Sequence, residues 1–352
     1  MADGGKYRVA ISGDFVRPDG TPAYPMFDLS PLTGDRRIEV DYVAAQDGAM
    51  PAAGLAGHDA LILLGSKFAR ASIPGDGRLA LVARFGVGYD NVDVEACTEN
   101  GIALAITPDG VRRPVAVAIL TYILALAGRL MIKDRLTREG PAGFAKKSQH
   151  MGVGLVGKTL GSIGIGNIGA EMFRLAKPFD LRFIAHDPYA DPKLAGALGV
   201  RLVDLEAVFR ESDFVTVNCP LMASTRHLVN AERLALMKPT AFFINTARGP
   251  IVDQKALTGV LQARRIAGAG LDVLEQEPPD LDDPILKLDN VIFAPHALCW
   301  TDQCFAGIGA SDVKAVLDVM RGREPAGVVN RAVLEIPAWR RRLAGLRARF
   351  AQ

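Results

Sequence analysis

One stretch, TLGSIGIGNIG at residues 159–169, decides how this 352-residue chain is interpreted. An apolar run typical of a β-strand leads into a G-x-G-x-x-G motif formed by Gly164, Gly166 and Gly169, and a helical pattern follows. In such a strand-turn-helix the first glycine permits a tight turn, the second brings backbone amides close to a pyrophosphate, and the third lets helix and strand pack closely. The bound anion then lies at the positive end of the helix dipole. The stretch therefore predicts a dinucleotide-binding turn.

Asp187 follows these glycines by about twenty positions, directly after a second strand pattern at residues 181–186. A carboxylate there can accept hydrogen bonds from an adenosine ribose, and it would repel the 2′-phosphate of NADP. Because no arginine follows until Arg201, we expect the cofactor to be NAD. A second G-x-G-x-x-G precedes the first strand and is interpreted as a flexible lead-in; it consists of Gly152, Gly154 and Gly157.

The composition is that of an ordinary globular protein, with 49% hydrophobic and 23% charged residues. At this length the chain is expected to form two domains with substantial cores. A net charge of +2, spread without strong blocks, argues against nucleic acid as the main partner. The exception is a C-terminal cluster that is expected to lie on a solvated helix face: Arg340, Arg341, Arg342, Arg347 and Arg349.

No feature of the sequence favours a metal site, a membrane or export. The four cysteines form no C-x-x-C and show no metal-ligand spacing with histidine, so no metal and reduced thiols are expected. The longest apolar run, residues 114–128, is judged too short for a bilayer and is expected to be a buried helix. The first residues include Asp3 and Lys6 and contain no apolar core of a signal peptide. We therefore expect a cytoplasmic protein without a membrane partner.

Strand patterns recur along the chain and alternate with segments compatible with helices. They predict an α/β protein of two doubly wound parallel-sheet domains, with a Rossmann NAD-binding domain inserted in a discontinuous flavodoxin-like substrate domain. The expected strands are residues 7–12, 60–64, 79–85, 102–106, 214–218, 241–245, 267–272 and 291–294, besides those around the glycine turn. A helix at 302–321 would cross back to the first domain. The expected division is 1–108 with 298–335 for substrate, 109–297 for NAD, and 336–352 as a basic C-terminal tail.

Arg248, Glu277 and His296 each come just after an expected strand. In an open α/β sheet the ligand crevice lies outside the carboxyl ends of the strands, so the three side chains could converge on one site. Reduction of a 2-oxo acid needs a hydride donor, a proton donor and a cation for the substrate carboxylate, which NADH, His296 and Arg248 would supply. Glu277 beside the histidine would stabilise the imidazolium, and the fork of an arginine can grip a carboxylate in a bidentate way.

Between about residues 79 and 330 the chain resembles the D-isomer-specific 2-hydroxyacid dehydrogenases, which include phosphoglycerate, glycerate/hydroxypyruvate and D-lactate dehydrogenases. The resemblance rests on the glycine turn and on five further motifs: RFGVGYDNVD from Arg84, NCPL from Asn218, NTARGPIVD from Asn245, GLDVLE from Gly270 with Glu277-Pro278, and Pro295-His296. It implies that Arg248, Glu277 and His296 take the catalytic roles of the family. It also implies a homodimer formed through the NAD-binding domain, with an arm that starts near Pro114.

The resemblance implies further binding residues. Val87 and Gly88 would offer backbone amides to the substrate carboxylate, and Trp300 would lie at the substrate. The cofactor would be contacted by residues that follow the strands of the NAD-binding domain: Gly164, Gly166, Asn167, Ile168, Gly169, Asp187, Cys219, Pro220, Thr225, Thr246, Ala247, Arg248, Asp272 and His296.

Two departures from the family pattern stand out. Ala297-Leu298-Cys299-Trp300 replaces the usual run of small residues after the histidine, so Trp300 could reshape the substrate pocket or serve only packing. Arg112 and Arg113 stand beside a position that is often acidic in the family. They could bind a second anionic group of the substrate, although a salt bridge at a domain hinge or dimer interface is the favoured interpretation.

Three functions remain open at this stage. The first is an NAD-dependent 2-hydroxyacid dehydrogenase, or 2-oxoacid reductase. The second is an NAD(H)-sensing, co-repressor-like interaction protein on the same fold, which fold alone does not exclude. The third is a formate- or phosphite-type dehydrogenase; Glu277 counts against formate, because formate enzymes of this kind typically carry glutamine there. Neither the substrate, nor the physiological direction, follows from the sequence.

Overall fold

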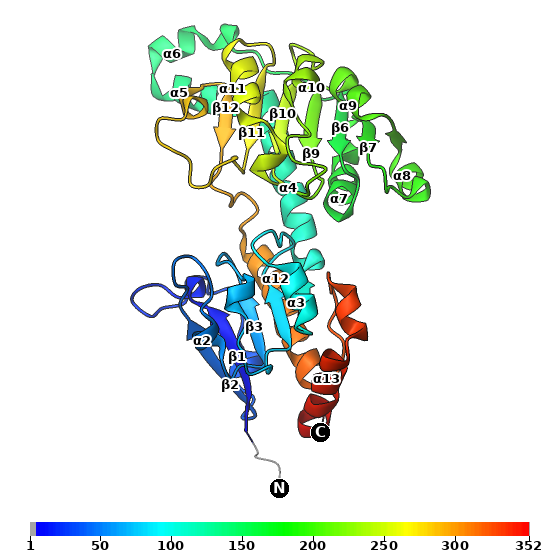
Figure 1. The fold of residues 1–352 in the computed structure, drawn as a ribbon. Helices are drawn as coiled ribbons and strands as arrows, with labels where there is room; N and C mark the ends of the chain where they lie inside the picture. Colours follow the sequence, from blue (N-terminus) through cyan, green and yellow to red (C-terminus); the bar gives the residue numbers. More distant parts are fainter. Residues whose placement is uncertain (1–4, 352) are drawn as a thin grey trace. The chain divides into compact units, whose positions relative to one another are not determined.

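The computed structural model describes residues 5–351, and the chain divides into two compact units (Figure 1). Unit 1 comprises Met1–Val111 and Trp300–Gln352, and unit 2 comprises Arg112–Cys299. These boundaries differ by two or three residues from those expected from the sequence. Residues 1–4 and 352 of the expected segments lie outside the described residues.

Unit 1 is built on a five-stranded sheet whose strands are all parallel. Their order, β2-β1-β3-β4-β5, is the flavodoxin-like one that the sequence predicts. The strands are β1 Tyr7–Ser12, β2 Ile38–Val43, β3 Ala60–Leu63, β4 Leu81–Arg84 and β5 Ala103–Ile106. Of these, β2 was not expected from the sequence. Every residue of β3 is buried, as a strand covered by helices on both faces requires.

The helices of unit 1 come from both ends of the chain. They are α1 Ser30–Thr33, α2 Ala52–Leu55, α3 Val94–Glu99, α12 Asp302–Met320 and α13 Pro337–Phe350. The expected basic tail is therefore a helix that packs on unit 1, since Trp339 is only 1% exposed and Phe350 stacks edge-on against Tyr7. Four of the five arginines are exposed on this helix, as expected: Arg340, Arg341, Arg347 and Arg349. Arg342 is the exception, because its guanidinium donates hydrogen bonds to the carbonyl oxygens of Leu79, Asn100 and Gly101.

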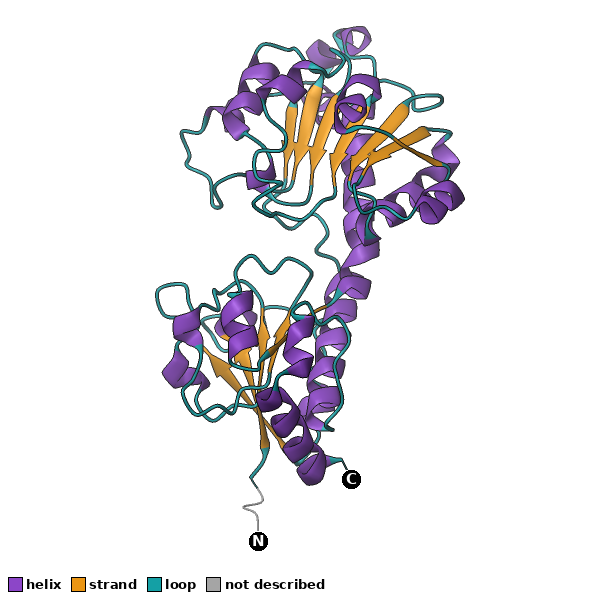
Figure 2. Ribbon diagram, turned by 45° about the vertical axis from the view of Figure 1, so that its right-hand side comes forward, coloured by secondary structure: helices purple, strands orange, loops and turns teal. Residues whose placement is uncertain are grey.

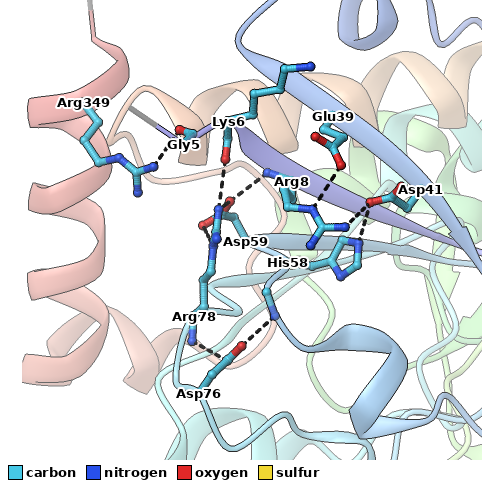
Figure 3. A network of polar contacts seen from close by, with 11 residues as sticks. Gly5, Lys6, Arg8, Glu39, Asp41, His58, Asp59, Asp76, Arg78 and Arg349 are labelled. Carbon is cyan, nitrogen blue, oxygen red and sulfur yellow. Dashed lines mark hydrogen bonds and ion pairs between the residues drawn. The ribbon is translucent and has the colours of Figure 1, made fainter. Parts of the chain in front are cut away.

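A polar network fixes the amino ends of the strands in unit 1 (Figure 3). Asp59, just before β3, accepts a hydrogen bond from the Arg8 amide at 2.8 Å and two from the Arg78 guanidinium at 2.7 and 2.8 Å. The Arg8 side chain in turn pairs with Asp41, which also contacts the buried His58 at 3.0 Å. This edge of the sheet is thus closed by ion pairs, and the opposite, carboxyl edge carries the loops relevant to ligand binding.

Unit 2 contains a seven-stranded, all-parallel sheet in the order β12-β11-β10-β9-β6-β7-β8. Counted from β6, this is the 3-2-1-4-5-6 order of the Rossmann fold with one strand added at the β11 side. The strands are β6 Thr159–Ile163, β7 Arg182–His186, β8 Val200–Leu202, β9 Phe214–Val217, β10 Phe242–Asn245, β11 Gly268–Leu271 and β12 Val291–Phe293. The strand order reverses between β6 and β9, where such folds bind dinucleotides.

Helices cover both faces of this sheet (Figure 2). They are α4 Pro108–Gly128, α5 Leu130–Arg138, α6 Pro141–Ala145, α7 Asn167–Ala176, α8 Pro192–Leu198, α9 Leu205–Glu211, α10 Ala231–Ala235 and α11 Gln254–Gln262. Two of these helices pack closely against the sheet where its strands carry a glycine. A Cβ at Gly161 would lie 3.0 Å from Val208 of α9, and one at Gly270 would lie 2.6 Å from the ring of Tyr122 in α4.

The expectation for α4 needs correction. The helix begins at Pro108, six residues before the expected start, and Pro114 lies inside it. With 21 residues it is long enough and apolar enough to span a membrane, so the sequence argument from length does not hold. However, 61% of the most apolar 18-residue segment of this helix is buried within the protein. A buried core helix of a globular protein can have the same length and hydropathy.

Candidate active site

At the end of β6, the glycine turn has the geometry that was predicted for each of its three glycines. Gly164 has a φ of +100°, and a Cβ there would lie 2.8 Å from the carbonyl of Asn218. A Cβ at Gly169 would lie 2.6 Å from the carbonyl oxygen of Gly164, whereas Gly166 faces open space. Helix α7 starts at Asn167 with no side-chain cap. The turn thus offers an open helix N-terminus to an anion, as a bound pyrophosphate requires.

The second glycine motif has a different environment. Gly152, Gly154 and Gly157 lie in the segment between α6 and β6, and no helix begins after them. Gly152 instead packs at the end of α4, where its Cβ would lie 2.6 Å from the carbonyl oxygen of Ala127. No helix follows the motif, as expected, but the close packing of Gly152 does not match the flexible lead-in predicted from the sequence.

Asp187 lies beside the glycine turn, at the carboxyl end of β7. One carboxylate oxygen accepts a hydrogen bond from the amide of Ile165 at 3.0 Å, and the other accepts from the amide of Tyr189 at 2.9 Å. The acid is therefore held at the edge where the adenosine ribose of a dinucleotide is expected. Arg201, on the neighbouring strand β8, pairs with Glu211. The residues present fit NAD.

The loop after β9 lies next to the glycine turn, since a Cβ at Gly164 would lie 3.0 Å from the amide nitrogen of Cys219. Thr225, expected at the cofactor, uses its hydroxyl to brace this loop: it donates to the carbonyl of Pro220 at 2.7 Å and accepts from the amide of Met222 at 2.8 Å. Burial raises the pKa of the Cys219 thiol to about 11, so this cysteine is a neutral, apolar wall at neutral pH.

Arg248 lies in a tight turn after β10. The side chain of Asn245 accepts a hydrogen bond from the amide of Ala247 at 3.0 Å and donates one to the carbonyl of Arg248 at 3.0 Å. Gly249 allows this turn to press on the following loop, because a Cβ there would lie 1.8 Å from the carbonyl oxygen of Leu274. The packing brings the arginine loop against the loop that carries Glu277.

Asp272 holds the histidine loop after β12. Its backbone carbonyl accepts from the amide of His296 at 2.8 Å, and its carboxylate accepts from the amides of Ala297 and Leu298 at 2.9 and 3.0 Å. These bonds stabilise the left-handed conformation of His296, whose φ is +55°. Burial raises the pKa of the Asp272 carboxyl, while the two amides oppose that effect.

Glu277 and His296 are in direct contact. The Nδ1 atom of His296 lies 2.8 Å from Oε2 of Glu277, and the other carboxylate oxygen accepts from the amide of Leu274 at 3.0 Å. Burial raises the pKa of Glu277, but the hydrogen bond and charge of His296 outweigh it, so the pKa is lowered. The carboxylate therefore stays ionised and fixes Nδ1–H, which leaves Nε2 as the ring nitrogen available for proton transfer.

The substrate residues expected outside this group, Val87, Gly88 and Trp300, belong to unit 1. Val87 and Gly88 follow β4, in a loop that is anchored where the Gly86 amide donates to the hydroxyl of Thr107 at 3.0 Å. Arg113 is used within unit 2, where it pairs with Glu171 of α7 at 2.9 Å.

Sequence reasoning missed Asp14, which follows β1 and accepts hydrogen bonds from the amides of Gly65 and Ser66. The signal available was a polar side chain directly after a strand. Among residues 5–351, no group of three or more His, Cys, Asp or Glu side chains is placed to hold a metal ion.

Comparison with known proteins agrees with this geometry. Residues 120–297 match the family model of the NAD-binding domain of D-isomer specific 2-hydroxyacid dehydrogenases, so unit 2 binds NAD. The glyoxylate reductase of Korarchaeum cryptofilum is 40% identical over 260 residues, which cover 74% of this chain and 78% of that protein. The D-3-phosphoglycerate dehydrogenase of Methanocaldococcus jannaschii is 40% identical over 267 residues, covering 76% of this chain and 50% of that protein.

Solved structures give the same result for the whole fold. The TT0316 protein of Thermus thermophilus is 30% identical with a TM-score of 0.77, over 92% of this chain and 99% of that one. An NADPH-dependent glyoxylate/hydroxypyruvate reductase of Sinorhizobium meliloti, solved with NADP and malonate, is 26% identical with a TM-score of 0.77, over 92% and 97% of the two chains. The chain thus belongs to the D-isomer specific 2-hydroxyacid dehydrogenases, NAD-dependent oxidoreductases of small 2-hydroxy and 2-oxo acids.

Proposed function

We propose that this protein interconverts a 2-oxo acid and the corresponding D-2-hydroxy acid, with His296 as the acid/base, Glu277 as its partner and Arg248 as the carboxylate-binding cation. The observation that carries the proposal is the 2.8 Å contact between Nδ1 of His296 and Glu277, on loops that follow neighbouring strands of an NAD-binding sheet. NADH, when bound, supplies the hydride to the carbonyl carbon of the substrate.

The residues of this chain would act as follows in the reductive direction. Arg248 binds the substrate carboxylate through the planar fork of its guanidinium. His296 donates the proton on Nε2 to the carbonyl oxygen as it gains charge, and the ionised Glu277 stabilises the imidazolium beforehand. In the oxidative direction the neutral histidine removes the hydroxyl proton. The balance is one 2-oxo acid, one NADH and one proton consumed for each hydroxy acid and NAD⁺ formed.

We propose further that NAD is preferred over NADP. Asp187 presents a carboxylate at the glycine turn, and the next arginine after it in the chain, Arg201, is paired with Glu211. A 2′-phosphate would therefore meet negative charge without a cation positioned to offset it.

Assembly as a homodimer through unit 2 is also proposed. Large apolar side chains in and after α4 and α5 are more than half exposed, which is unusual for a monomer surface. They are Leu130, Met131, Phe144, Met151 and Val156. Light scattering should give twice the chain mass for the protein, and the double variant Leu130→Glu/Met131→Glu should shift to the monomer mass. If that variant remained a dimer, the interface would have to lie elsewhere on the protein.

The test of the activity is a panel assay that follows NADH oxidation with glyoxylate, pyruvate, hydroxypyruvate, phenylpyruvate and phosphohydroxypyruvate. Turnover with at least one of these acids is expected. Confirmed NADH binding without turnover on any of them, or a change of binding partner on adding NADH, would favour a cofactor sensor instead. NAD⁺ reduction with phosphite or formate but not with hydroxy acids would favour the third function.

A further inference from the structure

An apolar pocket of about 220 Å³ lies in unit 1 at the start of α12. Three aromatic rings form its walls. Tyr24 stacks on Phe305 with ring centroids 4.5 Å apart, and Trp300 meets both edge-on at 5.6 and 5.2 Å. Although held in this cluster, the Trp300 side chain is 46% exposed. The pocket is therefore lined mainly by apolar and aromatic side chains.

The pocket lies at the ligand-binding edge of the unit 1 sheet. Tyr24 is in the long loop that follows β1, and Phe85 comes directly after β4; in a parallel sheet both loops gather at the carboxyl edge. The rings connect the two, because Phe305 packs on Phe85 with centroids 5.4 Å apart. Phe85 immediately precedes Gly86-Val87-Gly88, the loop proposed for the substrate carboxylate. Trp300 itself is four residues along the chain from His296.

The size and chemistry of the pocket select among substrates. An apolar cavity of about 150 Å³ holds benzene in a protein, so this pocket has room for a phenyl ring. Glyoxylate carries no side chain, so the aromatic walls of the pocket would stay exposed to water when it binds. A phosphorylated side chain would meet no partner, because none of the described residues that line the pocket is basic and Asp302 is acidic. Burial, followed by the charge of Asp14, raises the pKa of Tyr24, which keeps its phenol neutral.

We propose that this pocket takes the side chain of the substrate, and that the substrate is a 2-oxo acid with an aromatic or branched apolar side chain of about phenyl size. The inference rests on the proposed function above and narrows its substrate. Trp300, Tyr24 and Phe305 would then determine specificity, while the reaction remains that of His296, Glu277 and Arg248.

The first test compares kcat/KM for NADH-dependent reduction of phenylpyruvate and glyoxylate by the full-length protein. Contacts of this kind discriminate by about 10–200-fold, so phenylpyruvate should be favoured by at least about tenfold. Trp300→Ala should lower that preference by about tenfold, chiefly through the KM for phenylpyruvate. Trp300→Phe should retain most of it. The matched control is Tyr42→Ala, which removes an equally exposed ring of unit 1 that does not line the pocket.

A second readout does not depend on turnover. The chain has two tryptophans, Trp300 and the buried Trp339. Phenyllactate should change the tryptophan fluorescence of the wild-type protein with NADH bound, and the change should be lost in Trp300→Phe.

The outcomes separate the two proposals. If no 2-oxo acid is reduced although NADH binds, the proposed function fails and this inference fails with it. If glyoxylate is reduced as well as or better than phenylpyruvate, and Trp300→Ala leaves the ratio unchanged, the inference fails while the proposed function stands. A fluorescence change that persists in Trp300→Phe would also overturn it.

Discussion

Replacing Glu277 with glutamine removes the charge beside His296 and keeps the shape of the side chain. In the wild type each carboxylate oxygen accepts one hydrogen bond, from Nδ1 of His296 and from the amide of Leu274. Glutamine has a single acceptor oxygen, so Glu277→Gln must lose one of the two bonds as well as the charge. Because the pKa of Glu277 is lowered, the wild-type carboxylate stays ionised at neutral pH and places a negative charge beside His296.

The size of the effect follows from the geometry. Two unit charges about 4 Å apart interact by roughly 4 kcal/mol near a protein surface and roughly 1 kcal/mol in water. The side chains of His296 and Glu277 are 44% and 37% exposed, so solvent screening brings the interaction to about 1–2 kcal/mol. Since one pH unit corresponds to about 1.4 kcal/mol, the loss of the charge should shift the pH profile of the reaction by about one unit.

The assay is the pH profile of kcat/KM for NADH-dependent reduction of a 2-oxo acid. The profile should fall on the alkaline side as the proton donor is lost. In Glu277→Gln this fall should move to lower pH by about one unit, and the maximal rate should drop at least about tenfold. Glu275→Gln is the matched control, because Glu275 lies on the same loop but pairs with His227, at 2.6 Å. Profiles of Glu277→Gln and wild type that superimpose would refute the reasoning.

Four further variants test the cofactor turn, the cofactor choice and a buried carboxyl group. Gly164→Ala should destabilise the protein by about 1–3 kcal/mol in a denaturant titration, because Gly164 has a positive φ. Gly166→Ala, whose Cβ would meet open space, should keep wild-type stability and weaken NADH binding in a calorimetric titration. Equal effects of the two substitutions on stability would contradict this. Asp187→Asn should raise kcat/KM with NADPH relative to NADH by about tenfold, and an unchanged ratio would remove Asp187 from cofactor choice. Asp312 is fully buried on α12, and neither of its carboxylate oxygens is hydrogen-bonded. Burial raises the pKa of this carboxyl group, and the positive charge of Arg84 opposes that effect only in part. A raised carboxyl pKa lowers the free energy of unfolding as pH rises above the unfolded value, so Asp312→Asn should stabilise more at pH 8 than at pH 5; a loss at pH 8 would mean that the carboxylate is ionised and paired with Arg84.

The NAD-binding sheet could be predicted because its central strands are short apolar runs and its first turn needs glycines at fixed spacing. The missed strands lie at sheet edges, where polar residues replace the apolar run. In β2, Glu39 and Asp41 alternate with apolar residues and take part in ion pairs. The three-residue β8 has two exposed residues, Arg201 and Leu202. Neither strand buries enough apolar surface to show in the sequence.

Prolines and charges misled the prediction in two other places. Helix α4 was expected to start at Pro114, but it begins at Pro108, because proline is favoured in the first turn of a helix, where its missing N–H group has no partner to lose. The arginines of the C-terminal segment suggested a solvated tail. The packing of this helix is set by its buried residues Trp339, Leu346 and Phe350, which recur at i, i+7 and i+11 and so lie on one face among the arginines.

Of the candidate site, the sequence could identify the residues just after strand ends, because the topology of a parallel sheet brings them to one edge. Arg248, Glu277 and His296 were proposed in this way. Tyr24 was not, because its loop has no periodicity and its partner Phe305 is 281 positions away. Contacts of that separation are fixed only when the fold is formed.

The most direct test of the central claim is a comparison of His296→Ala with the wild type in two measurements on the same preparations. NADH affinity, measured by calorimetry, should be nearly unchanged, since the glycine turn and Asp187 are intact. Single-turnover reduction of the best 2-oxo acid should slow by about 10²–10⁴-fold, because the positioned proton donor is gone. A variant that binds NADH and reduces the acid at the wild-type rate would contradict the assignment of His296, and with it the mechanism proposed for this protein.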